Sequence, residues 1–298
     1  MKQKSRSFVV VDVMYILGMI VPILVAMACK VLLIAPEEGI SIAGAAIYWT
    51  IPLPFGGLPI TESQVNSWAV VIAVLFLCLF MTHGLSVKHP SKRQHLAELA
   101  VEKVQGLVQV NMGEYFEGFP PFICAVMALS GFSSLLSLFG LFAPTSDMNV
   151  VAGWAILVFI LITYYKMKCG PWHYCKSFAD PLPMLPMNII SEFATPVSMA
   201  FRHYGNVMSG SVVGVLVASG LTGVSSLILG WLPGALGKFP LFRIGIPAIL
   251  SIYFDIFSGC LQAFIFAMLT MLYVAGAFPA EDYLAKRARR KQKQMQNS

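Results

Sequence analysis

Four charged side chains lie inside long apolar stretches of this sequence: Asp12, Glu192, Arg202 and Asp255. Asp12 lies near the inner end of its stretch, where it can reach the membrane surface, and we expect it to be topological. A charged group inside a bilayer is costly and by default marks an ion path. Arg202 lies roughly ten residues inside its stretch, and a guanidinium does not lose its proton in proteins. The alternatives are a structural ion pair between Arg202 and Asp255, and a Glu192 carboxylate that only complements a helix dipole. We expect Arg202 to be functional, because apolar packing serves a purely structural role equally well.

Polar side chains follow helical spacing in both stretches. One set, spaced four, four and three residues apart, consists of Ser198, Arg202, Asn206 and Ser209. A second set consists of Asp255, Gly259 and Gln262. Residues at these spacings share one face of a helix, so two antiparallel helices would present facing polar stripes. The alternative for the serines and the asparagine is hydrogen bonding between helices, which is compatible with an ion path.

Other site chemistries find little support in the sequence. The five histidines are scattered along the chain, whereas a metalloenzyme needs clustered ligands. Cys169 and Cys175 flank His173, but a metal site there needs further ligands, so free thiols are expected. No P-loop pattern is present, and the basic residues lie in short loops rather than in one patch. We therefore expect no cofactor, no bound metal, no nucleic-acid partner and no catalytic chemistry of the chain's own.

The elements that position these residues are apolar helices. Of the 298 residues, 57% are hydrophobic and 11% are charged, against about 25% charged in soluble domains. About 20 apolar residues cross a bilayer as a helix, and six stretches qualify: 8–29, 63–87, 118–146, 148–165, 187–232 and 244–280. The sequence predicts an all-α, polytopic protein of the lipid bilayer, with about six transmembrane helices in a single integral membrane domain, 1–298.

One further helix, at 91–111, is amphipathic. Ser91 and Gln94 fit a capping box, and apolar residues then recur at helical spacing against charged ones. We expect this helix to lie on the cytoplasmic face of the membrane. The alternative is a partly buried loop helix.

The placement of lysine and arginine sets the orientation. With the N-terminus inside, cytoplasmic segments hold sixteen of the twenty lysines and arginines, and the opposite side holds only Lys30, Lys238 and Arg243. Both termini are therefore expected in the cytoplasm, the second as a basic tail at 281–298. Residues 187–232 are then one long, tilted helix, the first of a long C-terminal pair, because splitting them would move the tail outside.

Residues 8–29 have two interpretations. Basic residues precede them and Ala26-Met27-Ala28 is similar to a cleavage site, as in a signal peptide. The apolar part is longer than the 7–15 residues of a signal-peptide core, which favours a retained transmembrane helix.

The residues around Arg202 and Gln262 resemble subunit a of F-type (rotary) ATP synthases of bacteria. PVSMAFRHYGNVMSG, at 196–210, is similar to that family's signature around an essential arginine, and LQAFIF, at 261–266, is similar to its motif on the last helix. The segments ITESQVNSW (60–68), PTSDMN (144–149) and PMNIISE (186–192) are also similar. The family core is therefore expected at 60–280, with 8–29 as an extra N-terminal helix.

This resemblance implies a stator subunit in the bacterial plasma membrane that couples ion flow to rotation. Its partners would be the c-subunit ring, the b subunits of the peripheral stalk and the remaining ATP synthase subunits, which handle ATP. Arg202 would be the essential charge between two ion half-channels. Glu192, Asp255 and Ser211 would be polar steps along a half-channel, Gln262 and Asn206 would position Arg202 or water, and Ser198 would be a further residue of the ion path. The coupling ion is either H⁺ or Na⁺, and the ring largely sets which. The alternative is a stand-alone secondary ion transporter or channel.

The sequence departs from the family pattern at several positions. His203 and Tyr204 stand where leucine and phenylalanine are usual, and Ser211 where an acid or histidine is common. Asp255 stands where histidine or glutamate is common, and an asparagine usual in the family is missing from 130–136. These departures concern the polar residues of the half-channels.

Overall fold

The structure is a computed structural model that describes residues 2–34, 44–54, 56–87, 90–168, 170–172, 174, 182–229, 245, 249–250, 252–280 and 283. Within these residues, six helices are long and apolar enough to cross a membrane. They are α1 (Lys2–Leu33), α2 (Glu62–Thr82), α4 (Pro120–Leu135) with the turn η2 (Leu136–Phe139), α5 (Met148–Met167), α7 (Leu185–Leu229), and the π-helical turn η6 (Ile252–Ser258) with α9 (Gly259–Ala277). The predicted helical membrane fold with about six spans is confirmed.

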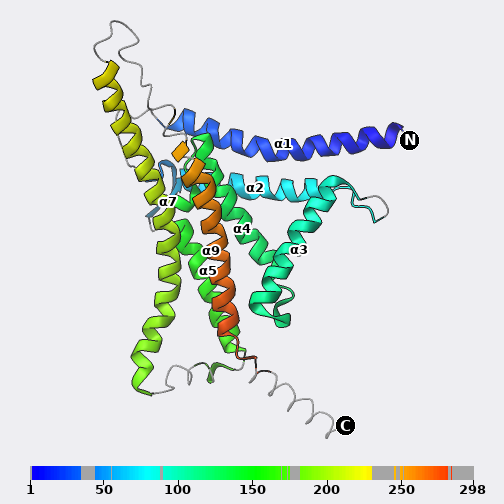
Figure 1. The fold of residues 1–298 in the computed structure, drawn as a ribbon, viewed down its shortest axis with the longest axis vertical. Helices are drawn as coiled ribbons and strands as arrows, with labels where there is room; N and C mark the ends of the chain where they lie inside the picture. Colours follow the sequence, from blue (N-terminus) through cyan, green and yellow to red (C-terminus); the bar gives the residue numbers. More distant parts are fainter. Residues whose placement is uncertain are drawn as a thin grey trace.

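The helices form two groups (Figure 1). α1 and α2 lie side by side and run across the direction of α7 and α9. α4, α5 and α9 pack together in the centre, and α7 runs along α5 and contacts η6 and α9. The amphipathic helix α3 (Lys92–Met112) packs against α4 and α9. Because α7 is a single helix of 45 residues, the prediction of one long helix there is confirmed.

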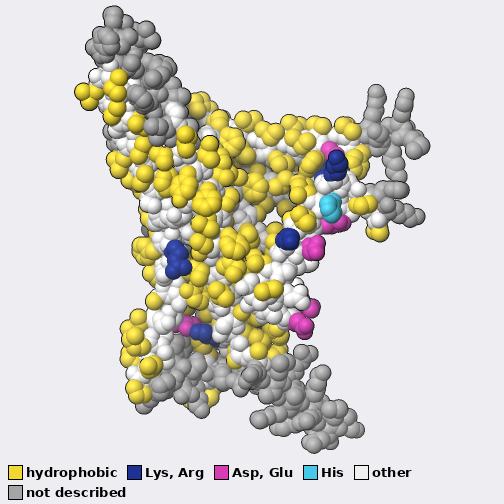
Figure 2. Space-filling view, in the orientation of Figure 1, with side chains coloured by type: hydrophobic (Ala, Val, Ile, Leu, Met, Phe, Trp, Pro, Cys, Tyr) yellow, Lys and Arg dark blue, Asp and Glu magenta, His cyan; other side chains and the backbone are white. Residues whose placement is uncertain are grey.

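The core lies where α3, α4, α5 and α9 meet. Ile123, Val158, Phe266 and Met271 are almost completely buried there, in one continuous apolar cluster. Most other apolar side chains point outwards, and hydrophobic groups cover much of the visible face, with charged groups few and scattered (Figure 2). An apolar exterior of this extent suits a protein whose solvent is lipid.

The third predicted span is shorter than its apolar run at 118–146. α4 ends at Leu135, and η2 then leads to Gly140, which has a left-handed backbone with φ of 71°. Glycine adopts this conformation without the penalty that a Cβ atom brings, and so it commonly ends helices. The turn η3 (Pro144–Ser146) precedes α5. Hydropathy alone does not detect this break, because the residues after Gly140 are still apolar.

A two-stranded hairpin is a further difference from the all-α prediction. β1 (Ile47–Leu53) pairs antiparallel with β2 (Gly56–Thr61), directly before α2. β-branched and aromatic residues bounded by prolines and glycines are the usual signal for such strands. The sequence contains this signal, but a prediction of membrane spans from hydropathy does not use it.

The start of α3 bears out only half of the predicted capping box. The Ser91 hydroxyl accepts a hydrogen bond from the backbone N–H of Gln94 at 3.3 Å. The Gln94 side chain does not return to Ser91, because its amide donates instead to the carbonyl of Ser86 and to the carboxylate of Glu98. The same side chain therefore ties α3 to the loop that follows α2.

Ion pairs attach α1 to the bundle at both ends. Near the start of α1, Arg93 donates two hydrogen bonds of 2.9 Å to the carboxylate of Asp12, and Nδ1 of His83 lies 2.9 Å from the same carboxylate. Near its end, Nζ of Lys30 lies 3.2 Å from the carboxylate of Glu62. Asp12 was expected to be topological, and in the structure it links α1 to α2 and α3.

Candidate functional site

Arg202 projects from the outer face of α7. Its side chain is exposed, whereas Met199, Ala200 and His203 beside it are buried against the bundle. Within the part of the chain that the structure describes, no hydrogen bond or ion pair joins Arg202 to another residue, Asp255 included. A guanidinium that is unpaired on an apolar surface can bind an anionic group of another chain.

The register between α7 and α9 follows from two contacts. Nδ2 of Asn206 donates to the hydroxyl of Ser258 at 2.9 Å, and that hydroxyl donates to Oδ1 of Asn206 at 3.2 Å. One turn further along α7, Gly210 lies against the side chain of Phe254, so closely that an added Cβ would be 3.1 Å from the ring. The helices are therefore antiparallel. Counting back one turn from Asn206 and forward one turn from Ser258 places Arg202 level with Gln262.

The two polar faces predicted from spacing thus meet. They meet at one contact and not along their whole length. Gln262 is buried, with 4% of its surface exposed, and Gly259 is buried against Ser134 of α4. The contact that joins the faces is made by Asn206 and Ser258. The role expected for Asn206, positioning Arg202 or water, is therefore accompanied by a structural one.

Glu192 lies at a second level, ten residues before Arg202 and so about 15 Å away along α7. Its side chain is 9% exposed and forms an ion pair with Lys166 at the end of α5. The hydroxyl of Tyr174 donates to the other carboxylate oxygen at 3.5 Å. A cavity of about 300 Å³ opens beside this pair, and its lining comprises Ile162, Lys166, Ser191, Glu192, Thr195, Leu272, Tyr273, Gly276 and Ala277.

Asp255 lies at a third level, on the far side of Arg202. It belongs to η6, seven residues before Gln262 and so about 10 Å away along the helix. The side chain is half-buried, and no hydrogen bond or ion pair to another described residue satisfies its carboxylate. Arg202 therefore lies between two carboxylates that are at opposite ends of the α7–α9 pair.

Ser198 and Ser211 are less closely tied to these levels. Both side chains are exposed, and Ser198 lies one turn before Arg202. The hydroxyl of Ser211 donates to the backbone carbonyl of Met208 at 2.8 Å. Ser198 thus shares the outer surface with Arg202, whereas Ser211 is bonded to its own helix.

A separate polar cluster lies at the start of α2. Glu62, Ser63 and Asn66 are buried there, with at most 4% of their surfaces exposed. Ser63 donates to the carboxylate of Asp147, while Lys30 pairs with Glu62. Contacts of η6 with α4 and η2 place this cluster on the same side of the molecule as Asp255. It offers oxygen atoms and charge at the end of the bundle opposite to Glu192.

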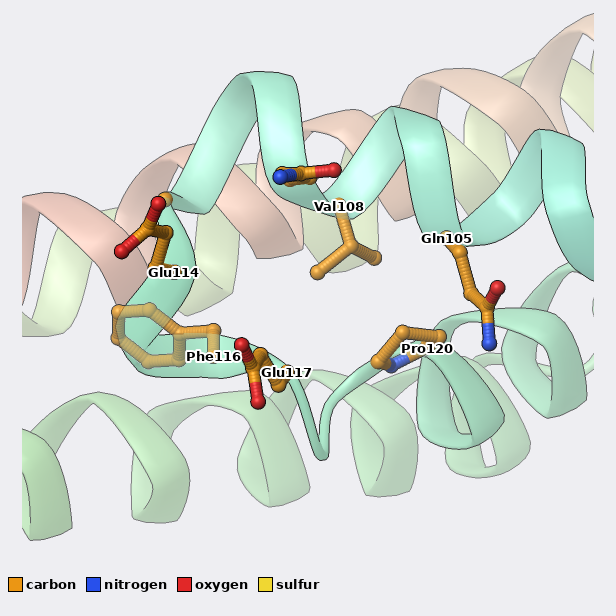
Figure 3. Close-up of a pocket in the computed structure, with 8 residues that line it drawn as sticks. Gln105, Val108, Glu114, Phe116, Glu117 and Pro120 are labelled. Atoms are coloured by element: carbon orange, nitrogen blue, oxygen red, sulfur yellow. The ribbon is translucent and has the colours of Figure 1, made fainter.

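A second cavity, of about 370 Å³, contains none of the predicted site residues. It lies between the end of α3 and the start of α4, and its walls include Val108 and Pro120 (Figure 3). Glu114 and Glu117 add carboxylates to its rim. The cavity is remote in sequence from the α7–α9 pair, and we assign it no part in the ion path.

The described part of the chain contains no group of side chains suited to binding a metal ion. Among those residues, no three or more histidine, cysteine, aspartate or glutamate side chains are grouped so as to hold a metal ion. Cys169, His173 and Cys175 lie outside the described residues. The basic tail predicted at 281–298 also lies outside them, except for Tyr283.

The sequence analysis does not predict three residues of the site. Ser258 has the spacing of the Asp255–Gln262 face, and so the same periodicity could have found it. Lys166 was assigned to topology only, and its pairing with Glu192 depends on contact between α5 and α7. His203 was noted only as a departure, yet it is completely buried. No local pattern indicates that burial.

Comparison with known proteins matches this chain to one family over most of its length. A family model described as ATP synthase A chain matches residues 65–275. ATP synthase subunit a of Legionella pneumophila (strain Philadelphia 1) is 27% identical over 76% of this chain and 90% of its own. The subunit a of Alkalihalophilus pseudofirmus is 32% identical over 74% of this chain and 93% of its own. A protein of Propionigenium modestum described as "ATP synthase subunit a, sodium ion specific" is 27% identical over 76% of this chain and 78% of its own.

Proposed function

The chain belongs to the ATP synthase A chain family, subunit a of the Fo membrane sector, and from this premise we propose that Arg202 separates two ion half-channels. Subunit a is a multi-pass membrane protein and the ion-translocating, non-catalytic stator of its complex, so its partners include other ATP synthase subunits. This membership replaces the alternative of a stand-alone transporter. The observation that carries the proposal is the position of Arg202, which is exposed between the levels of Glu192 and Asp255 and has no ion-pair partner among the described residues.

Arg202 acts through a charge that cannot be titrated. An ionised carboxylate of a c-subunit ring that arrives opposite Arg202 is attracted, and its ionised form is favoured because a neighbouring positive charge lowers a carboxyl pKa. The same charge opposes a direct cation leak between the two half-channels. A lysine is a weaker substitute, because its pKa falls readily on burial.

The half-channel on the side of Glu192 is the cavity beside the Glu192–Lys166 pair. The cavity is large enough to hold several water molecules, since one occupies about 30 Å³ in the liquid. Thr195 adds a hydroxyl to its lining on the way from Glu192 towards Arg202. This half-channel is proposed to open on the cytoplasmic side, a proposal that the excess of lysine and arginine in the segments expected inside supports.

The half-channel on the opposite side is proposed to reach Asp255. Its carboxylate is half-buried, and the polar cluster of Glu62, Ser63 and Asn66 lies at the same end of the bundle. From Asp255, the next buried polar side chain on the same face is Gln262, level with Arg202. Ser198, Asn206 and Ser211 are proposed to hold water or to orient the groups along this path.

The proposed setting is the plasma membrane of a bacterium, with both termini in the cytoplasm. The exposed face of α7 that carries Arg202 is proposed to face the c-subunit ring. The b subunits of the peripheral stalk are proposed as further partners, which hold subunit a still while the ring turns. Residues 281–298 are proposed to form a basic cytoplasmic tail.

The test is ATP-driven ion pumping in inverted membrane vesicles that contain the whole complex. In Arg202→Ala, pumping should fall to background while the subunits still co-purify, because the side chain is exposed and contributes little packing. Ser226→Ala, an exposed change near the end of the same helix and outside the polar face, serves as the control and should pump normally. Normal pumping by Arg202→Ala would refute the role of Arg202. Isolation of the chain as a functional protein without ring or catalytic subunits would contradict the assembly.

A further inference from the structure

His203, the residue after Arg202, is held by all three central helices. It is completely buried, and its Nε2 lies 3.3 Å from Oγ of Ser130 on α4, a hydrogen bond in which either atom can donate. Its ring meets Trp154 of α5 and Phe266 of α9 edge to face, with centroids 5.9 and 5.3 Å away. One side chain of α7 therefore makes a directional contact with α4 and ring contacts with α5 and α9.

Packing alone does not explain a histidine at this position. Its second ring nitrogen, Nδ1, is buried and has no hydrogen-bond partner in the described part of the chain. A buried polar atom without a partner destabilises the folded state. A leucine would fill a similar space without that cost. The bond to Ser130 therefore has to contribute something that an apolar side chain does not.

What the bond contributes is the direction of the neighbouring arginine. Successive residues on an α-helix point about 100° apart, so a fixed inward direction for His203 fixes the outward direction of Arg202. The other buried neighbours, Met199 and Ala200, are apolar and make no directional contact. Beyond Gly210, α7 is lightly packed, because Ser225 is the one buried residue among 211–228. The hydrogen bonds between Asn206 and Ser258 fix α7 against α9 one turn further along, and the bond between His203 and Ser130 fixes α7 against α4 directly behind Arg202.

We propose that His203 is a positioning residue, whose hydrogen bond to Ser130 sets the rotation of α7 so that Arg202 faces the ring. The proposal rests on the function proposed above for Arg202. The contact joins two residues that are 73 positions apart in the sequence. A polar pair contributed by α4 and α7 thus lies directly behind the essential charge.

The experiment measures ions pumped per ATP hydrolysed by the complete synthase in inverted vesicles. His203→Leu removes the hydrogen bond and keeps a similar volume, and it should lower this ratio about two- to tenfold, the range that corresponds to the loss of one hydrogen bond. Ser130→Ala removes the same bond from the other side and should lower the ratio similarly. The double variant should be no worse than either single one, because both changes remove one interaction. Ser133→Ala, a buried serine on the same helix, is the matched control and should couple normally.

His203→Gln distinguishes positioning from proton transfer. A glutamine amide can hydrogen-bond Ser130 but cannot carry a proton, so this variant should recover at least part of the coupling. A glutamine variant as uncoupled as His203→Leu would overturn the proposal. Normal coupling in Ser130→Ala would overturn it as well, even if His203→Leu fails to assemble.

Arg202→Ala, measured in parallel, separates the two proposals. If Arg202→Ala pumps normally, the function proposed for Arg202 fails. If Arg202→Ala is inactive while both Ser130→Ala and His203→Leu couple normally, only the positioning role of His203 fails.

Discussion

A guanidinium keeps its charge at every pH that a membrane protein meets, so Arg202 cannot pass a proton from one carboxylate to the next. Its use in this account is as a fixed charge, exposed on α7 between Glu192 and Asp255. The two carboxylates differ in their surroundings. Glu192 is paired with Lys166, whereas Asp255 has no partner among the described residues. Removal of each group should therefore have a different consequence.

For Asp255→Asn we expect a several-fold loss of ion flux with an intact complex. The amide keeps the shape of the side chain but removes the charge and the titratable group, so position 255 can no longer take up and release a proton. ATP-driven pumping in vesicles measures it, with co-purified subunits as the measure of assembly. Flux equal to that of the unchanged protein would remove Asp255 from the path.

For Lys166→Met we expect a loss of flux that Glu192→Gln partly repairs. The single change leaves a nearly buried carboxylate without its cation, which is strongly unfavourable. The double variant removes both charges and so avoids that penalty. Passive ion conduction through vesicles stripped of the catalytic subunits reports the effect. A double variant that conducts less than Lys166→Met would contradict the coupling of the two residues.

At the scale of the helices, the sequence could predict which segments cross the membrane but not how their faces meet. The spacing of Ser198, Arg202 and Asn206 identified one face of α7, because a helix has a fixed period. The level of Arg202 opposite Gln262 needed the contact between Asn206 and Ser258, which joins residues 52 positions apart. Long-range pairings of this kind leave no local signal.

The same limit applies to the ends of the helices. Apolar residues continue past Gly140, so hydropathy extended the third span beyond the end of α4. The π-helical turn at Ile252–Ser258 was likewise invisible, because periodicity near 3.6 fits an ordinary helix equally well. Such turns are frequent at functional sites, and this one carries Asp255.

For Arg93→Ala we expect looser attachment of α1. The change removes two hydrogen bonds of 2.9 Å to the carboxylate of Asp12, and hydrogen bonds to charged groups contribute about 1.5–3 kcal/mol each. Because both groups are about one-fifth exposed, the lower end of that range is the better guide. Thermal unfolding of the purified protein in detergent measures the loss. Arg93→Lys, which keeps the charge but not the paired geometry, should have an unfolding midpoint between those of Arg93→Ala and the unchanged protein. An unchanged midpoint for Arg93→Ala would contradict the attachment of α1 through Arg93 and Asp12.

At the scale of the whole molecule, the two groups of helices have different roles. The pair α1 and α2 lies across the direction of α7 and α9 (Figure 1), and ion pairs at both ends hold α1 to the bundle. The long pair α7 and α9 carries the charges and exposes Arg202 beside the exposed apolar side chains of Val197 and Phe201. A rigid support and a lightly packed outer helix together suit a stator beside a moving partner.

The central claim is that Arg202 separates two aqueous paths that open on opposite sides of the membrane. The most direct measurement is one-sided labelling of the assembled complex with a membrane-impermeant thiol reagent, after replacement of the six native cysteines. Single cysteines are introduced as Thr195→Cys, in the cavity beside Glu192, and as Asp255→Cys in η6. We predict that Thr195→Cys reacts only from the cytoplasmic side and Asp255→Cys only from the opposite side. Labelling of both positions from the same side would contradict the claim.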